Sequence, residues 1–296
     1  MFKNISLEKK GELLALSHAI LGGLITVTGK GAINFISPIL AIAIMYLISS
    51  LILFPFFITE KKQNNIKFTK NDLFYFLASI VIIIIFSHGL IFWALSKVSA
   101  IDSSILIQSE TFFTFIFFAK FHEKITKELI IGALLIFLGT LGILFQDLSL
   151  SLGIGEICII IATMIAPFGN YYQKKIVRKF SALQLLFWRN FSGAVFFSLV
   201  SLILFDFNEK LMNDIFQAGI FLLIGGIFSY SLAKITFLTS IKYINVSKSI
   251  PLALAPVPMF TMIFAFLFLG EKVSFLQFIS FLIIFMGIMF ITKKPT

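Results

Sequence analysis

A glutamate, Glu110, stands in the middle of an apolar stretch, residues 99–123, that is long enough to cross a bilayer. In one continuous helix, Ser99, Ser103, Glu110 and Thr114 share a stripe roughly 60° wide. A carboxylate inside a bilayer is costly, so we expect it to face a bundle interior or a watery cavity. Two interpretations stay open for Glu110: a proton site or partner of a cationic group, and a neutral carboxyl that hydrogen-bonds a neighbouring helix for stability.

Two cationic side chains, Arg189 and Lys234, also fall inside apolar runs. Either can bind a carboxylate or phosphate of a substrate, Arg with two parallel hydrogen bonds and Lys through a single charge. Arg189 lies about two turns from the end of its run, so extension of its side chain to the membrane surface is slightly favoured over that role. For Lys234, extension toward Lys242 and an interior polar cluster with Tyr230 are equally supported.

Helix breakers mark one further candidate, Asn170, which follows Pro167 and Gly169. An interrupted helix frees backbone groups that can contact a solute inside the membrane. A kink made only for packing is the alternative, but Gly22 and Gly23 hold the corresponding place in the first apolar run, which favours a functional break.

Histidines occur in the first and third apolar runs, at His18 and His88. A histidine can relay protons near neutral pH. A neutral ring that hydrogen-bonds a carbonyl or hydroxyl is the more common case, and it is favoured for both residues, with His88 kept as a candidate.

The composition shows what must position these side chains. Of 296 residues, 59% are hydrophobic and only 13% are charged, and the mean hydropathy is +1.03. Soluble domains carry about twice that share of charged residues, so a soluble globular protein is excluded. The pattern shows no strand-like alternation, which leaves an all-α integral membrane protein.

Ten apolar runs are each long enough to form a membrane helix. The segments that flank the runs, together with the ends of the runs, carry 18 lysines and arginines on the side of the N-terminus and 4 on the other side. The positive-inside rule therefore predicts a multi-pass protein of the inner (plasma) membrane with both termini in the cytoplasm. The runs are 12–33, 35–58, 72–95, 99–121, 127–146, 153–173, 181–205, 215–241, 246–270 and 274–292.

The second half of the chain repeats the first. Lys30 matches Lys174 at an offset of 144 residues, and Lys97 matches Lys242 at 145. Glu123-Lys124 matches Glu271-Lys272 at 148, which predicts a short insertion in the ninth run. We therefore predict two five-helix repeats, residues 1–147 and 148–296, forming one membrane unit. Five is odd, so the second repeat enters the membrane from the opposite side and the repeats are inverted.

Other classes of protein lack support. The net charge of +10 comes from lysines dispersed in short loops, which argues against nucleic-acid binding. A single cysteine, Cys158, excludes a disulfide framework, and we expect neither a metal site nor a cofactor. No phosphate-binding loop, HExxH or GxSxG motif is present, so neither an ATP-driven pump nor a common hydrolase is indicated.

Two repeats that each close with an apolar run, a Glu-Lys pair and a glycine-containing last helix resemble the EamA-like family of the drug/metabolite transporter superfamily. The second repeat matches best, through LALAPVPMF at 252–260 and LFLGEKVS at 267–274. The first departs from the pattern, with Thr111 after Glu110 and with FHE at 121–123. The resemblance spans the chain and implies a carrier of small metabolites, often an exporter of amino acids or related solutes.

The sequence thus predicts a secondary transporter, not an enzyme, that moves a small metabolite by alternating access, coupled to protons or by exchange. Its partners are the solute and the lipid bilayer, and a homodimer stays open. The candidate substrate-binding or coupling residues are Glu110, Lys234, Arg189, His88, Asn170 and Tyr230. The alternatives are a sugar-phosphate or nucleotide-sugar carrier and a membrane-embedded enzyme that acts on lipid with His88 and Glu110 as acid and base.

Overall fold

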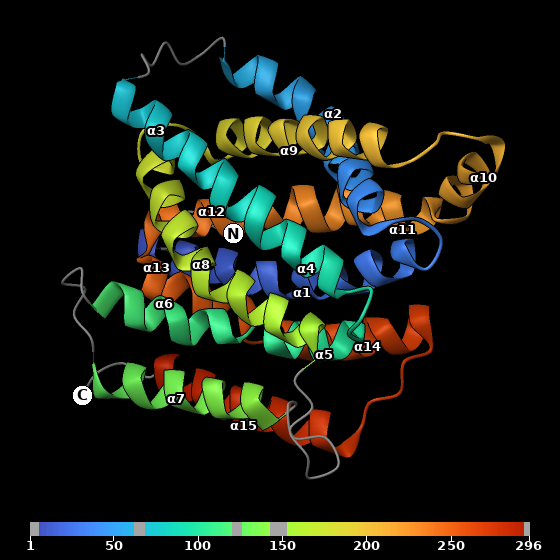
Figure 1. Cartoon of the computed structure of the whole chain (residues 1–296). Helices are drawn as coiled ribbons and strands as arrows, with labels where there is room; N and C mark the ends of the chain where they lie inside the picture. The colour runs from blue at the N-terminus through green and yellow to red at the C-terminus, as the bar shows by residue number, and fades with distance from the viewer. Residues whose placement is uncertain (1–5, 62–68, 120–125, 143–152, 293–296) are drawn as a thin grey trace.

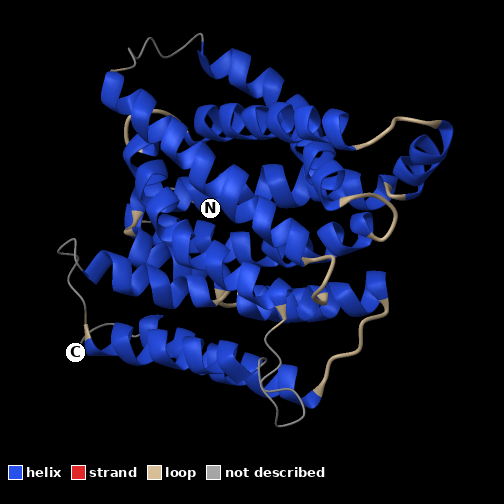
Figure 2. Cartoon of the chain, viewed as in Figure 1, coloured by secondary structure: helices blue, strands red, loops and turns tan. Residues whose placement is uncertain are grey.

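The structure, a computed structural model, describes residues 6–61, 69–119, 126–142 and 153–292. Within these ranges every regular element is helical and no strand occurs (Figure 2). The elements are α1 (Leu7–Ile33), α2 (Pro38–Lys61), α3 (Lys70–Ser79), the π-helix η1 (Ile80–His88), α4 (Gly89–Ala94), α5 (Ala100–Leu106), α6 (Ser109–Ala119), α7 (Lys127–Gly142), α8 (Ile154–Val177), α9 (Ala182–Leu204), α10 (Glu209–Gln217), α11 (Gly219–Ile224), the π-helix η3 (Gly225–Ala233), α12 (Lys234–Tyr243), α13 (Val246–Leu254), α14 (Val257–Leu269) and α15 (Phe275–Thr292).

Seven helical segments in the described part of the chain are long and apolar enough to cross a membrane. They are Leu7–Ile33, Pro38–Glu60, Lys70–Ala94, Ile154–Val177, Ala182–Leu204, Gly219–Tyr243 and Val246–Leu269. Two shorter apolar helices, Ile130–Gly142 and Phe275–Gly287, and the α5–α6 pair occupy the remaining predicted runs. All ten runs therefore contain helix, and the membrane-protein prediction is confirmed.

Local sequence explains where several of these helices begin or end. Thr69 and Asp72 form a capping box at the start of α3, and Ser181 and Gln184 form another at the start of α9. Each pair satisfies two backbone amides that the first turn of a helix leaves without partners. Gly270 ends α14 with φ 67°, a left-handed conformation that glycine adopts without steric cost.

The two halves of the chain interleave. Helix α1 packs against η3, α12, α13 and α14, and helix α8 packs against α3, η1, α4 and α6. The first helix of each half therefore lies among the helices that form the third and fourth apolar runs of the other half. The pairs α2–α9 and α7–α15 flank this centre at opposite edges of the bundle (Figure 1).

Irregularities recur at matching places in the two halves. The π-helices η1 and η3 begin 145 residues apart, at Ile80 and Gly225, and both are nine residues long. Turns also interrupt the fourth and ninth runs, at 107–108 and 255–256. These turns lie 148 residues apart, and α13 is longer than α5 (nine residues against seven), so the inserted residues lie before the break.

The break at 107–108 corrects the expectation of one continuous helix through Glu110. No proline causes it, whereas the equivalent turn contains Pro256. Instead, the amides of Gln108, Glu110 and Thr111 bond carbonyls three residues back, at 3.0, 3.1 and 2.9 Å. These 3₁₀-type bonds tighten the chain, and such a segment inside a helix often marks a functional hinge.

Polar contacts at the predicted cytoplasmic ends join segments from both halves. The ammonium of Lys248 pairs with Glu8 and Glu12 at 2.6 Å each. Lys179 pairs with Asp72, and the Ser181 hydroxyl donates to Glu60. In each contact the two residues are ones that the sequence places on the same side of the membrane.

The predicted outer ends hold contacts of their own. Lys30 donates to the carbonyls of Leu95 and Val98 at 2.7 and 3.0 Å, which stabilises the end of the third segment. The Glu271 carboxylate accepts the amides of Ala100 and Ile101 at 3.0 and 3.2 Å, at the N-terminus of α5. Its predicted repeat partner, Glu123-Lys124, lies outside the described residues.

Candidate functional site

A central cavity of about 80 Å³ lies where the two halves interleave. Its lining comes from α1, η1, α4, α5 and α6 of the first half and from α8, α9, η3, α12, α13 and α14 of the second. This volume holds several water molecules. All six predicted site residues, Glu110, Asn170, Arg189, Tyr230, Lys234 and His88, line it.

The turn at 107–108 places Glu110 in the first turn of α6, facing the cavity. Asn170 of α8 donates its Nδ2 to Glu110 Oε1 at 2.7 Å, and this bond joins the two halves of the chain. Asn170 is buried, whereas Glu110 keeps part of its surface toward the cavity. A carboxylate that accepts a hydrogen bond and faces a water-sized space can gain or lose a proton there.

Lys234 begins α12, immediately after η3, and also faces the cavity. In the described part of the chain its ammonium makes no hydrogen bond and no ion pair within 4.0 Å. Its charge nevertheless interacts with those of Glu110 and Arg189. The polar-cluster interpretation of Lys234 therefore describes its position better than extension to the surface.

Arg189 does not extend to the membrane surface, which corrects the interpretation that the sequence slightly favours. Its side chain is 1% exposed, and its Nη1 donates to Gln173 Oε1 at 3.1 Å. Two other guanidinium nitrogens, Nε and Nη2, have no hydrogen-bond partner among the described residues, and neither has Gln173 Nε2. Packing of α9 against α2 and η1 directs this side chain inward.

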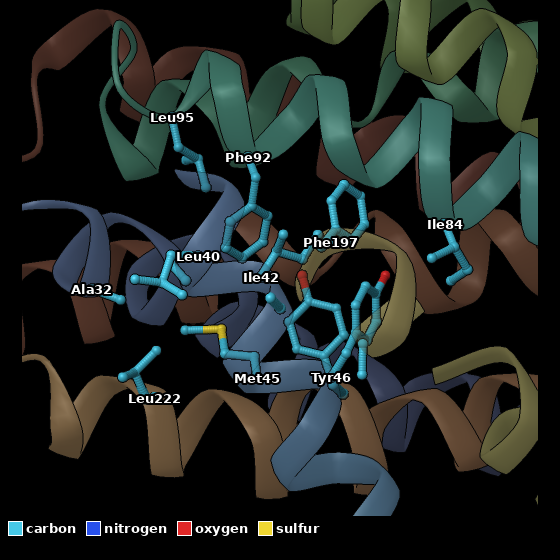
Figure 3. Packing of buried hydrophobic residues seen from close by; sticks show 14 of the residues in the cluster. Ala32, Leu40, Ile42, Met45, Tyr46, Ile84, Phe92, Leu95, Phe197 and Leu222 are labelled. Carbon is cyan, nitrogen blue, oxygen red and sulfur yellow. The ribbon is translucent and has the colours of Figure 1, made fainter. Parts of the chain in front are cut away.

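His88 ends η1 and shares a hydrogen bond with the Tyr46 hydroxyl of α2 through its Nδ1. The Tyr46 ring meets Tyr230 edge-on with centroids 4.9 Å apart, and it stacks on Phe197. Tyr46 and Phe197 belong to the buried cluster drawn in Figure 3. His18 instead bonds the carbonyl of Ala233 through Nδ1 at 2.8 Å. Both histidines are thus hydrogen-bonded, as the sequence favours, while each also lines the cavity.

Sequence reasoning missed Gln173 and Tyr46. Gln173 lies three residues after Asn170 on α8, and this spacing places both side chains on one helix face. The spacing could therefore have identified Gln173 as a candidate. Tyr46 is the one tyrosine in an apolar run, and nothing in its spacing connects it to His88.

The cavity contains one acidic and two basic side chains that are charged at neutral pH in water, together with two histidines. With Glu110 ionised and the histidines neutral, the formal balance is one positive charge. No group of three His, Cys, Asp or Glu side chains within the described ranges is arranged to hold a metal ion. The chemistry this set supports is recognition of charged solute groups and proton exchange.

Comparison with known proteins places the chain in a family. A model of the EamA-like transporter family matches twice, over residues 9–145 and 153–293. No curated protein matches. A solved crystal structure of a protein with 14% sequence identity superposes with a TM-score of 0.70, over 95% of this chain and 98% of that chain, and it shows the same fold. Two matches that together span nearly all of the sequence show that this protein belongs to the EamA-like transporter family.

Proposed function

We propose that this protein is a secondary transporter that carries a small metabolite across the plasma membrane by alternating access, with export as its direction. The observation that carries the proposal is the charged cavity between two interleaved repeats. Carriers built from repeats commonly place their solute site at such an interface. Rocking of the repeats about this site would expose it to each side in turn.

The membrane arrangement is part of the proposal. Ten helical segments cross the bilayer, as two inverted repeats with both termini in the cytoplasm. The polar contacts described above support this arrangement, because each joins segment ends that the topology puts on one side. The ends of α1 and α13 that meet through Lys248 would separate when the cytoplasmic side opens.

Glu110 is the proposed coupling residue. It reaches α8 through Asn170, and it lines the same cavity as Lys234, His18 and His88. Protonation removes the negative charge that opposes Lys234 and Arg189, so the charge of the site changes by one with each proton. A solute that carries charge therefore competes with, or travels with, a proton at this position.

A small solute fits this cavity better than a nucleotide sugar does. The space is about 80 Å³, and aromatic rings of Tyr46, Tyr230 and Phe92 pack together beside it. The alternative of a lipid enzyme has no supporting observation, since His88 and Glu110 lie within helical segments that line an interior cavity.

The test is a flux assay in proteoliposomes with amino acids, organic acids, nucleosides and sugar phosphates, run at several external pH values. Wild type should transport at least one solute in a pH-dependent manner. Glu110→Gln should keep solute exchange and lose its pH dependence, because glutamine cannot ionise. Glu209→Gln, an exposed change on α10, is the matched control and should behave as wild type.

Absence of flux for every solute under every gradient would contradict the transporter proposal. If Glu110→Gln transports with an unchanged pH profile, Glu110 has only a structural role and the coupling proposal fails.

A further inference from the structure

One edge of the Arg189 guanidinium has no partner within the described residues. Nη1 is engaged by Gln173 Oε1, whereas Nε and Nη2 are buried without an acceptor. These two nitrogens form one side of the planar fork, and their N–H bonds run parallel. This is the geometry that receives the two oxygens of one oxyanion.

A third donor faces the same cavity. Gln173 uses its carbonyl oxygen to hold Arg189, so its Nε2 amide remains available and has no acceptor either. Gln173 is fully buried, and both residues line the cavity. The bond between them fixes the orientation of the guanidinium, which lowers the entropy lost when an anion binds.

Leaving these donors without acceptors is unfavourable for folding. A buried polar group without a hydrogen bond destabilises the protein, and a buried charge without a counter-ion does so more. An ionisable side chain kept inside a membrane is therefore a functional site by default. Arg189 forms no ion pair with any described residue, so no carboxylate within the described ranges pairs with it directly.

We propose that Arg189 and Gln173 form a carboxylate-binding subsite, in which Nε and Nη2 of Arg189 bind a carboxylate of the solute side-on and Gln173 Nε2 donates a further hydrogen bond. This inference rests on the proposed function, because it names the chemical group by which the transported solute is recognised. Arg189 and Gln173 come from the second half of the chain, opposite Glu110 of the first.

The charge balance favours a carboxylate over a phosphate monoester. With Glu110 ionised, Lys234 and Arg189 leave one positive charge in the cavity, and one carboxylate neutralises it. A phosphate dianion would leave one net negative charge in the cavity. The two parallel donors also match a planar group with two oxygens.

The first experiment measures binding to purified full-length protein by the rise of its melting temperature. The probes are glycine, L-alanine, L-phenylalanine, pyruvate and lactate, with the matching carboxamides and glycerol phosphate. Carboxylates should stabilise wild type and carboxamides should not. Arg189→Lys should weaken apparent carboxylate affinity by about tenfold or more, because lysine keeps the charge and loses the paired donors.

Controls separate a binding role from a structural one. Arg178→Gln removes an exposed arginine at the end of α8 and should bind as wild type does. Arg189→Met should lose carboxylate stabilisation while melting no lower than wild type without ligand, because it removes a buried charge that lacks a partner. A large drop in ligand-free stability in Arg189→Met, with binding retained in Arg189→Lys, would show that Arg189 is structural and overturn the proposal.

The two proposals fail in different ways. Transport of a carboxamide or of glycerol phosphate, with no effect of carboxylates, overturns the subsite and leaves the transporter intact. Carboxylate binding that depends on Arg189, without flux in proteoliposomes, supports the subsite and contradicts the transporter.

Discussion

At the scale of single residues, the polar side chains of the site divide into those that have a hydrogen-bond partner and those that have none among the described residues. Glu110 has its Asn170 donor, His18 has the Ala233 carbonyl, and His88 has Tyr46. Lys234 and one edge of Arg189 have no hydrogen-bond partner among the described residues, and both residues line the cavity. The hydrogen-bonded groups join neighbouring helices, and under the proposed function the groups without partners bind the solute while Glu110 exchanges a proton.

The hydroxyl of Tyr46 offers a test of this division. Tyr46→Phe should destabilise the protein by about 1–3 kcal/mol, because it leaves Nδ1 of the half-buried His88 without its partner. Tyr230→Phe is the matched control: it is buried in the same ring cluster, and its hydroxyl has no partner in the described structure, so its melting temperature should stay near wild type. Equal melting temperatures of the two variants would show that the Tyr46–His88 bond contributes little.

At the scale of elements, the interrupted helices position the site. The turn at 107–108 allows Glu110 to begin a new helix, and η3 ends directly before Lys234. In η3 the Ser231 hydroxyl bonds the carbonyl of Gly226, five residues back, which a π-helix brings within reach. The matching interruptions in both repeats indicate that the irregular geometry belongs to the repeat itself.

The α7–α15 pair depends on two glycines for its close packing. A Cβ at Gly139 would lie 2.7 Å from the carbonyl oxygen of Ser280, and one at Gly287 would lie 2.6 Å from that of Gly132. Small residues are what allow membrane helices to approach this closely.

Alanine at Gly139 or Gly287 should therefore force the helices apart and destabilise the protein by about 1–3 kcal/mol, measured by thermal unfolding in detergent. Gly219→Ala serves as the control, because nothing lies within 4 Å of its added Cβ. Wild-type stability of both α7–α15 variants would contradict the packing argument.

At the scale of the whole molecule, interleaving explains why one cavity contains residues from both repeats. Each half inserts its first helix between the third and fourth segments of the other, so neither half can enclose the site by itself. In the proposed alternating access, motion of one repeat against the other would change access to the cavity from both sides. Under this proposal, the contacts of Lys248 with Glu8 and Glu12 and the contacts of Glu271 with the start of α5 would break and form during that motion.

The orientation in the membrane is testable with single cysteines in a Cys158→Ser background. Lys210→Cys on α10 should react with a membrane-impermeant maleimide in intact cells, because the topology places it outside. Arg178→Cys at the end of α8 should react only after permeabilisation. The opposite pattern would place both termini outside and reverse the proposed topology.

The sequence by itself determined the protein class, the ten helical runs, the repeat and the six candidate residues. These follow from local properties: the bilayer requires runs of about 20 apolar residues, and a polar side chain inside such a run stands out. The tertiary structure decided which polar groups meet, that Arg189 points inward to Gln173, and that the helix breaks before Glu110. Those features depend on how each helix is rotated against its neighbours, and that rotation is determined by packing between residues far apart in the chain.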